Sequence, residues 1–279
     1  MVMFIFMLVI MMSLLCVMVN NVIVWWSVFL LMTLIFCNLN KSIINYSTIF
    51  NYFVLQESLG LIFLLLAYNY VQLMIVFLKI GVAPLHFWIF SVTNGVFGFN
   101  LMWFLTFQKL PFLLVMLQMM MIKIIVLLLA GLLVCLMQML LIKSYKNLLI
   151  LSSTESFNWL ILGFVFSFLN VMMIFFYYFL MMLILIPKFN FNLQFLSWET
   201  TLVFLNLPFS VNFFVKVFSL SEVLKYDSVW ILLLLFMMFL SVLSLSFWLV
   251  NLSVNVVNKK LIYNNLIYFI LPLMLILLI

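Results

Sequence analysis

The chain has 279 residues, of which 71% are hydrophobic and 6% charged, and its formal net charge is +6. This composition excludes a soluble globular domain and indicates one polytopic membrane domain. The basic residues are scattered singly rather than gathered in a patch, which argues against nucleic acid as a partner. All eleven are lysine and none is arginine, a bias that we interpret as pressure from a T-rich genome with few arginine codons, such as that of an organelle.

Apolar segments of about 20 residues, the length that crosses a bilayer, follow one another along the chain. They predict an all-α membrane protein with about eleven transmembrane helices and no soluble domain. The first segment carries no charge and no cleavage site, so we expect a retained helix rather than a signal peptide. The predicted helices lie near residues 2–19, 22–39, 49–67, 71–90, 101–119, 122–142, 147–168, 169–186, 199–221, 229–250 and 261–279.

Lysines in the connecting loops predict the sidedness of the chain. The side opposite the N-terminus holds only Lys123 and Lys225, the latter offset by Glu222 and Asp227. The positive-inside rule therefore places the N-terminus inside, which in an organelle is the matrix. The lysines on the N-terminal side are Lys41, Lys143, Lys146, Lys188, Lys259 and Lys260.

Three ionisable residues, Glu57, Lys79 and Lys109, lie near the centres of consecutive predicted helices. A charge at that depth costs about 2.5–3.5 kcal/mol, so such residues usually serve a function. From mid-span a lysine stem does not reach the headgroups roughly 15 Å away. Lysine can also release its proton when it is buried, whereas arginine does not. The three residues therefore predict a route for protons or ions through the membrane.

Glu57 is the expected partner of Lys79, because both lie at the centres of their helices and a short turn joins the two helices. Alternatively, Glu57 is protonated and hydrogen-bonded to the neighbouring Gln56 or Ser58. Glu155 lies in a second polar stretch, Ser-Ser-Thr-Glu-Ser, whose hydroxyls and carboxyl could line a hydrated cavity. The hydroxyls can equally bond to the backbone of their own helix, so only the glutamate is informative.

His86 is the only histidine of the chain and follows Lys79 by seven residues. Because histidine titrates near neutral pH, it could relay protons between that lysine and a loop. A lone histidine beside Phe87 and Trp88 is equally often an interfacial anchor. Lys216 lies nearer the end of its helix, where a structural role is almost as well supported as a functional one.

Two predicted helices combine a lysine with a helix-breaking residue. The fourth carries Lys79, Gly81 and Pro84, and the ninth carries Pro208 and Lys216. Helices five places apart run antiparallel, so this pattern predicts two inverted five-helix repeats with broken helices 4 and 9. The repeats would span residues 1–119 and 122–250 within the single domain 1–279, with 261–279 as a lateral final helix. The alternative is that the prolines are kinks of no consequence.

No metal or cofactor site is expected in this chain. Cys16, Cys37 and Cys135 stand alone in apolar segments, without the spacing that holds zinc or an iron–sulfur cluster. A single histidine excludes bis-histidine haem within the chain. No nucleotide-binding loop or flavin motif is present either.

The stretch Leu-Lys-Ile-Gly-Val-Ala-Pro-Leu-His-Phe-Trp, residues 78–88, is followed by Phe-Gln-Lys at 107–109. This block resembles the family of NADH dehydrogenase subunit 2, an antiporter-like membrane subunit of mitochondrial complex I. Weaker similarities are Asn51 to Gln56, Leu207-Pro208 with Lys216, and Lys146 with Ser152, Ser153 and Trp159. The resemblance spans about residues 20–225.

The resemblance implies inverted five-helix repeats and a part in redox-driven proton pumping. By position, Lys79 would be the lysine of the first broken helix, Lys109 the central relay and Lys216 the lysine of the second broken helix. The family usually has a glutamate in the second helix that pairs with the first lysine, but the equivalent position here is Leu30. Val215 likewise replaces the family's proline, and Ser156 its histidine.

We therefore interpret the chain as a proton-translocating subunit of NADH:ubiquinone oxidoreductase in the inner mitochondrial membrane. Its partners would be other complex I subunits and lipids, and those subunits would bind NADH and quinone. The expected proton path consists of Lys79, Lys109 and Lys216, with Glu57 and His86. The alternatives are a free-standing cation/proton antiporter, which should carry a mid-membrane aspartate or paired carboxylates for its cation, and a structural spacer. Asp227, the only aspartate, lies in a loop.

Overall fold

The computed structural model describes residues 2–41, 46–66, 68–96, 98–120, 124–142, 144–186, 211–226 and 229–255. The regular elements within these ranges are helices. The chain divides into two compact units, Met1–Met121 and Ile122–Ile279. The predicted break at Pro208 and the predicted final helix 261–279 lie outside the described residues.

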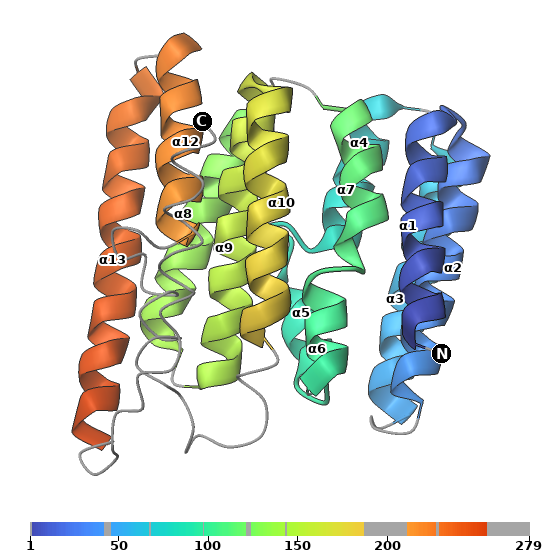
Figure 1. Ribbon diagram of the computed structural model, residues 1–279, viewed down its shortest axis with the longest axis horizontal. Coiled ribbons are helices and arrows are strands. Elements are labelled where there is room, and N and C mark those ends of the chain that lie inside the picture. Colours follow the sequence, from blue (N-terminus) through green and yellow to red (C-terminus); the bar gives the residue numbers. More distant parts are fainter. Residues whose placement is uncertain are drawn as a thin grey trace. The chain divides into compact units, whose positions relative to one another are not determined.

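Seven helices build the described part of the first unit (Figure 1). Helix α2 packs against α1, α3, α6 and α7, while α4 packs against α3 and α7. The interior of this unit therefore lies around α2, α3, α4 and α7. The helices are α1 (Val2–Met18), α2 (Val22–Asn40), α3 (Tyr46–Leu65), α4 (Asn69–Ile80), α5 (Phe87–Thr93), α6 (Gly98–Leu105) and α7 (Lys109–Gln118).

The sequence of α2 explains both its start and its buried face. The side chain of Asn21 accepts a hydrogen bond from the Ile23 N–H at 2.9 Å and caps the helix. Trp25, Phe29 and Phe36 recur at helical spacing and are buried. Phe29 stacks on Phe112 of α7 with ring centroids 4.6 Å apart, so aromatic packing fixes α2 against α7.

The predicted helix 71–90 is two helices, α4 and α5, separated by residues 81–86. Gly81 ends α4 in the left-handed conformation, with φ of 76°, which glycine adopts without the steric cost that other residues meet. Pro84 follows in the connection. The Trp88 indole N–H donates to the Leu78 carbonyl at 2.8 Å, so α5 is tied back to the end of α4.

The predicted helix 101–119 also contains an interruption, which the sequence analysis did not anticipate. A turn at residues 106–108 separates α6 from α7, and Lys109 is the first residue of α7. The Gln108 N–H bonds to the Trp103 carbonyl at 3.0 Å, one residue beyond the regular α-helical spacing. Pro111 fits the first turn of α7, where its missing N–H breaks no intrahelical bond.

The described helices of the second unit are long and run side by side (Figure 1). Helix α9 packs against α8, α10 and α12, and α13 packs against α8 and α12. Ser167 has extended backbone and separates α9 from α10. The helices are α8 (Ile125–Leu141), α9 (Tyr145–Phe166), α10 (Phe168–Leu185), α12 (Val211–Tyr226) and α13 (Val229–Asn255).

Four helical segments in the described ranges are long and apolar enough to cross a membrane: Val22–Asn40, Tyr46–Leu65, Gly98–Gln118 and Lys146–Phe166. Large apolar side chains are exposed on several helices, as lipid contact requires; examples are Phe4, Phe50 and Leu232. The prediction of an all-helical membrane chain is thereby confirmed. The count of eleven helices and the inverted repeats stay predictions.

Candidate functional site

Lys79 is buried in the last turn of α4, with 4% of its surface exposed. Its Nζ donates to the main-chain oxygen of Gln56 at 2.7 Å, and the Gln56 side-chain amide donates to the Lys79 carbonyl at 3.3 Å. The ammonium also lies 5.4 Å from the ring centre of Phe29 and 5.9 Å from that of Phe112. A helix carbonyl and two aromatic faces therefore stabilise this charge.

Glu57 faces α2 instead of pairing with Lys79. Its Oε1 lies 2.7 Å from the Thr33 hydroxyl, which is also 2.7 Å from the Leu30 carbonyl. Among the described residues, no ion pair within 4 Å joins Glu57 to Lys79. The two residues therefore form no direct ion pair, because residue 56 meets the lysine and residue 57 is turned about 100° further around α3. The Glu57 carboxylate still interacts with Lys79 electrostatically over a longer distance.

The alternative partners predicted for Glu57 are not used either. The Ser58 hydroxyl donates to the Leu55 carbonyl at 3.0 Å, and the Gln56 amide donates to Lys79. The carboxyl of Glu57 nevertheless meets Thr33 on α2, the helix that carries Leu30 where the family has its acid. A carboxyl from α3 thus contacts this helix without occupying that acid's position.

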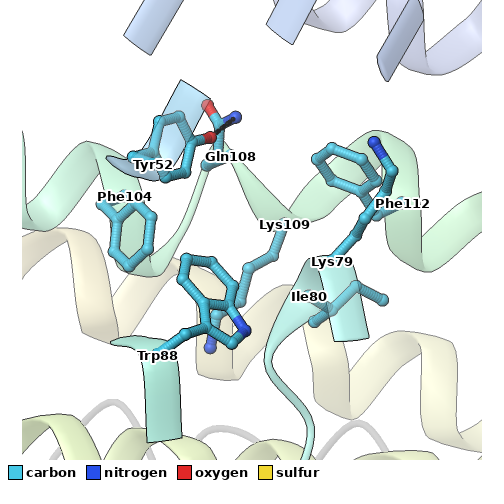
Figure 2. A pocket seen from close by; sticks show the side chains of 8 residues that line it. All are labelled: Tyr52, Lys79, Ile80, Trp88, Phe104, Gln108, Lys109 and Phe112. Atoms are coloured by element: carbon cyan, nitrogen blue, oxygen red, sulfur yellow. Dashed lines mark hydrogen bonds between the residues drawn. The ribbon is translucent and has the colours of Figure 1, made fainter. Parts of the chain in front are cut away.

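Lys79 and Lys109 line one small cavity of the first unit (Figure 2). Its volume is about 10 Å³, which is close to the space of a single water molecule. Figure 2 shows the two lysine side chains extending in opposite directions from this region. The remaining lining residues are Tyr52, Ile80, Trp88, Phe104, Gln108 and Phe112.

Lys109 is buried at the start of α7, with 6% of its surface exposed. The preceding residue fixes this position: the Gln108 amide donates to the Tyr52 hydroxyl at 3.0 Å and to the Met32 carbonyl at 3.1 Å. These bonds connect the turn before α7 to α3 and α2. The interruption of the helix at residues 106–108 therefore determines the position of Lys109 in the interior of the unit.

His86 is fully buried at the start of α5, with 0% of its surface exposed. Its ring lies 5.1 Å from that of Phe87 and 5.8 Å from that of Phe90. Because residues 81–86 interrupt the helix, His86 does not continue the α4 face that carries Lys79. Its part in a proton path stays a prediction.

Lys216 and Glu155 form a buried ion pair in the second unit. Their Nζ and Oε1 atoms are 2.5 Å apart, and the two side chains are 1% and 2% exposed. Lys216 also donates to the Ser241 hydroxyl at 2.9 Å, and the Trp159 indole N–H donates to Glu155 Oε1 at 3.3 Å. Helices α9, α12 and α13 therefore converge on one acid–base pair.

Glu155 is the site residue that the sequence analysis did not include in its proton path. Its neighbours Ser152, Ser153 and Thr154 each donate to the carbonyl three residues earlier, at 2.9, 2.7 and 2.8 Å. The alternative prediction for these hydroxyls, bonding within their own helix, is confirmed. The sequence feature that could have identified Glu155 is a single carboxyl at the middle of an apolar helix, with Trp159 one turn later.

A second ion pair in the same unit gives a useful contrast. Lys225 and Glu222 lie three residues apart on α12, with Nζ and Oε1 2.7 Å apart. The Lys225 side chain is 56% exposed. The Glu222 side chain is only 8% exposed, so solvent reaches this pair through the lysine alone. Solvent screening weakens such contacts, and this pair serves as a reference for the one that is buried on both sides.

The comparisons with known proteins agree with the resemblance seen in the sequence. No family model matches the chain. It is 58% identical over 279 residues to the NADH-ubiquinone oxidoreductase chain 2 of Caenorhabditis elegans, covering 99% of both chains. It is 48% identical over 247 residues to the protein of the same name from Ascaris suum, covering 88% of this chain and 82% of the relative.

A solved structure shares the fold. The chain matches a chain of respiratory complex I from Thermus thermophilus, determined with bound aureothin, with a TM-score of 0.74 and 15% sequence identity. The match covers 96% of this chain and 75% of the other. At 58% identity over nearly its whole length, the chain belongs to the NADH-ubiquinone oxidoreductase chain 2 family.

Proposed function

We propose that the chain is a proton-translocating, antiporter-like core subunit of NADH:ubiquinone oxidoreductase, complex I. It couples electron transfer in other subunits to proton movement across the inner mitochondrial membrane. Membership of the family supports the assignment to this enzyme. One observation carries the proton role: Lys79, Lys109 and Lys216 are each at most 6% exposed and lie inside apolar helices. Buried charges in such helices are costly to retain without a function.

In this proposal Lys79, Lys109 and Lys216 carry the protons. Lys79 and Lys109 line the same small cavity, which places the two lysines in one part of the first unit. Glu57 and His86 are the tentative members of the path: Glu57 has a hydroxyl partner on α2, and His86 is buried beside the break after α4. Protons thus pass between groups that the apolar interior holds in place.

The chemistry of the electron carriers belongs to other subunits. No metal, flavin or nucleotide motif occurs in the sequence, so we assign NADH and quinone binding to the complex I subunits that assemble with this chain. The N-terminus faces the matrix and lipids surround the helices. The exposed apolar side chains of α1 and α13 support the contact with lipid, and the lysines of the loops support the orientation.

The proposed architecture is two inverted five-helix repeats, 1–119 and 122–250, followed by the final helix 261–279. The division of the chain into the units Met1–Met121 and Ile122–Ile279 supports a repeat boundary near residue 121. Each unit also contains a buried lysine beside a predicted break. Lys79 lies on the helix before the break at Gly81 and Pro84, and Lys216 lies on the helix after the predicted break at Pro208. Inverted repeats place their charged site near mid-membrane in this way.

Native electrophoresis in mild detergent tests the assignment. Antibodies to this chain should detect it in the same band as the NADH-oxidising activity, and NADH-driven proton uptake by that complex in vesicles should require the chain. A chain that migrates alone and exchanges a cation for protons in vesicles would instead be a free-standing antiporter.

A further inference from the structure

The contact between Glu155 and Lys216 joins an acid and a base without an intervening water. Glu155 lies at the middle of the 22-residue helix α9, and Lys216 lies in α12. Their charged atoms are 2.5 Å apart, and neither side chain exposes more than 2% of its surface. Among the described residues this is the ion pair that is buried on both sides.

Packing alone does not account for such a pair. Apolar residues of similar size often stabilise a buried site as well as an ion pair does, so a buried pair is weak evidence for a stabilising role. Ionisable residues inside membrane helices instead tend to mark proton or ion pathways. The same three helices, α9, α12 and α13, also bury apolar residues, among them Val215, Leu160 and Met237, so they carry ample apolar surface for packing.

We propose that Glu155 is a proton-carrying residue of the second unit, which exchanges a proton directly with Lys216. The proposal rests on the proposed function of the chain and extends it to a residue outside the lysine series. Ser241 is a positioning residue, because it offers the lysine a second acceptor 2.9 Å away. The indole N–H of Trp159 supports the carboxylate form.

The exchange is balanced within the pair. The N–H bond of the Lys216 ammonium breaks and an O–H bond forms at Glu155 Oε1, so that ammonium and carboxylate become amine and carboxylic acid. No other reactant is needed. The net charge of the pair is zero before and after the transfer, so the step adds no net charge to the apolar interior.

A further proton that reaches the pair protonates Glu155 and ends the attraction between the two residues. Glu155 then becomes a neutral acid while Lys216 stays an ammonium, and the Coulomb attraction between them is lost. The Ser241 hydroxyl donates its own hydrogen to the Met238 carbonyl at 2.7 Å, which leaves its oxygen lone pairs available to the ammonium. Ser241 thus holds the lysine in the state that Glu155 no longer stabilises.

Lys79 of the first unit makes no equivalent contact with a described acid. Lys79 donates to a main-chain carbonyl, and Glu57 meets the Thr33 hydroxyl. An acid in direct contact therefore distinguishes Lys216 from Lys79. A main-chain carbonyl stabilises Lys79 in the first unit, whereas a carboxylate stabilises Lys216 in the second.

The test uses intact complex I purified with the variant chain and reconstituted in vesicles. Glu155→Gln preserves the shape of the side chain and its reach to Lys216 but does not ionise. We expect it to lose proton uptake coupled to NADH oxidation. The redox-difference infrared spectrum should also lack the carboxylic C=O band that wild-type complex shows when Glu155 takes up its proton. Glu222→Gln, the matched carboxyl control from the ion pair whose lysine is exposed, should retain both signals.

The double variant Glu155→Gln with Lys216→Met separates function from packing, because it leaves no buried charge unpaired. We expect it to assemble and to remain deficient in proton uptake. Normal uptake by the assembled double variant, an unchanged infrared band in Glu155→Gln, or failure of both variants to assemble would each overturn the proposal.

Lys216→Met alone distinguishes this inference from the proposed function. If it pumps normally, the proposed proton role of Lys216 fails, and the exchange fails with it. If Lys216→Met is deficient in proton uptake while Glu155→Gln pumps normally, the lysine path stands and only the role of Glu155 is rejected.

Discussion

Replacing Lys79 with methionine should leave the fold intact. The substitution loses one charge-assisted hydrogen bond to the Gln56 carbonyl, about 1.5–3 kcal/mol. It also loses the contacts with two aromatic rings, about 0.5–1 kcal/mol each. The Gln56 carbonyl lies within α3 and keeps its intrahelical partner.

The substitution also removes a charge that costs about 2.5–3.5 kcal/mol at the centre of a membrane helix. Losses of about 2.5–5 kcal/mol and this gain largely cancel, so the net change lies between a stabilisation of about 1 kcal/mol and a destabilisation of about 2.5 kcal/mol. We therefore expect Lys79→Met to assemble at near wild-type abundance on native gels. Proton uptake by the reconstituted complex should fall, because methionine carries no proton.

Lys41→Met is the matched control, because Lys41 is exposed at the end of α2 and lies outside the proposed path. It should assemble and pump as the wild type does. Loss of the complex in Lys79→Met alone would contradict the energy balance, whereas full proton uptake by the assembled variant would reject the proton role of Lys79.

Three further changes give separate tests. Lys109→Met should assemble but pump weakly, measured as proton uptake per NADH oxidised, and an unaltered ratio would remove Lys109 from the path. Thr33→Val should remove the hydroxyl that donates to Glu57, which destabilises the site by about 1–3 kcal/mol and slows coupled turnover. Thr33→Ser keeps the hydroxyl and should behave as the wild type does, so equal turnover in the two variants would show that the hydroxyl is irrelevant. Gly81→Ala should destabilise the complex by about 1–2 kcal/mol or more, because alanine is strained at a φ of 76° and its Cβ would meet the Ile89 side chain; an unchanged thermal midpoint would count against this account.

The sequence was sufficient to predict the helices and one of their interruptions. Apolar runs of membrane length identify α1, α2 and α3 closely, since lipid demands continuous helices. Gly81 and Pro84 carry recognisable backbone chemistry, so the break after α4 could be predicted. The turn before Lys109 could not, because it depends on bonds that Gln108 makes to α2 and α3.

The partners of the buried charges were harder to predict than their burial. Hydropathy predicts that Lys79 and Lys109 lie inside the membrane, but the rotation of α3 decides whether residue 56 or residue 57 meets Lys79. The pair of Glu155 with Lys216 joins residues 61 positions apart. Only the packing of α9 against α12 brings them together, and no local pattern encodes that contact.

The number of protons translocated per electron tests the central claim most directly. The measurement compares wild-type complex I with complex that carries Lys79→Met, Lys109→Met and Lys216→Met together, both reconstituted in sealed vesicles and supplied with NADH and quinone. If this chain carries protons, the assembled triple variant should translocate fewer protons per electron than the wild type. An identical ratio in the two complexes would contradict a proton path through this subunit.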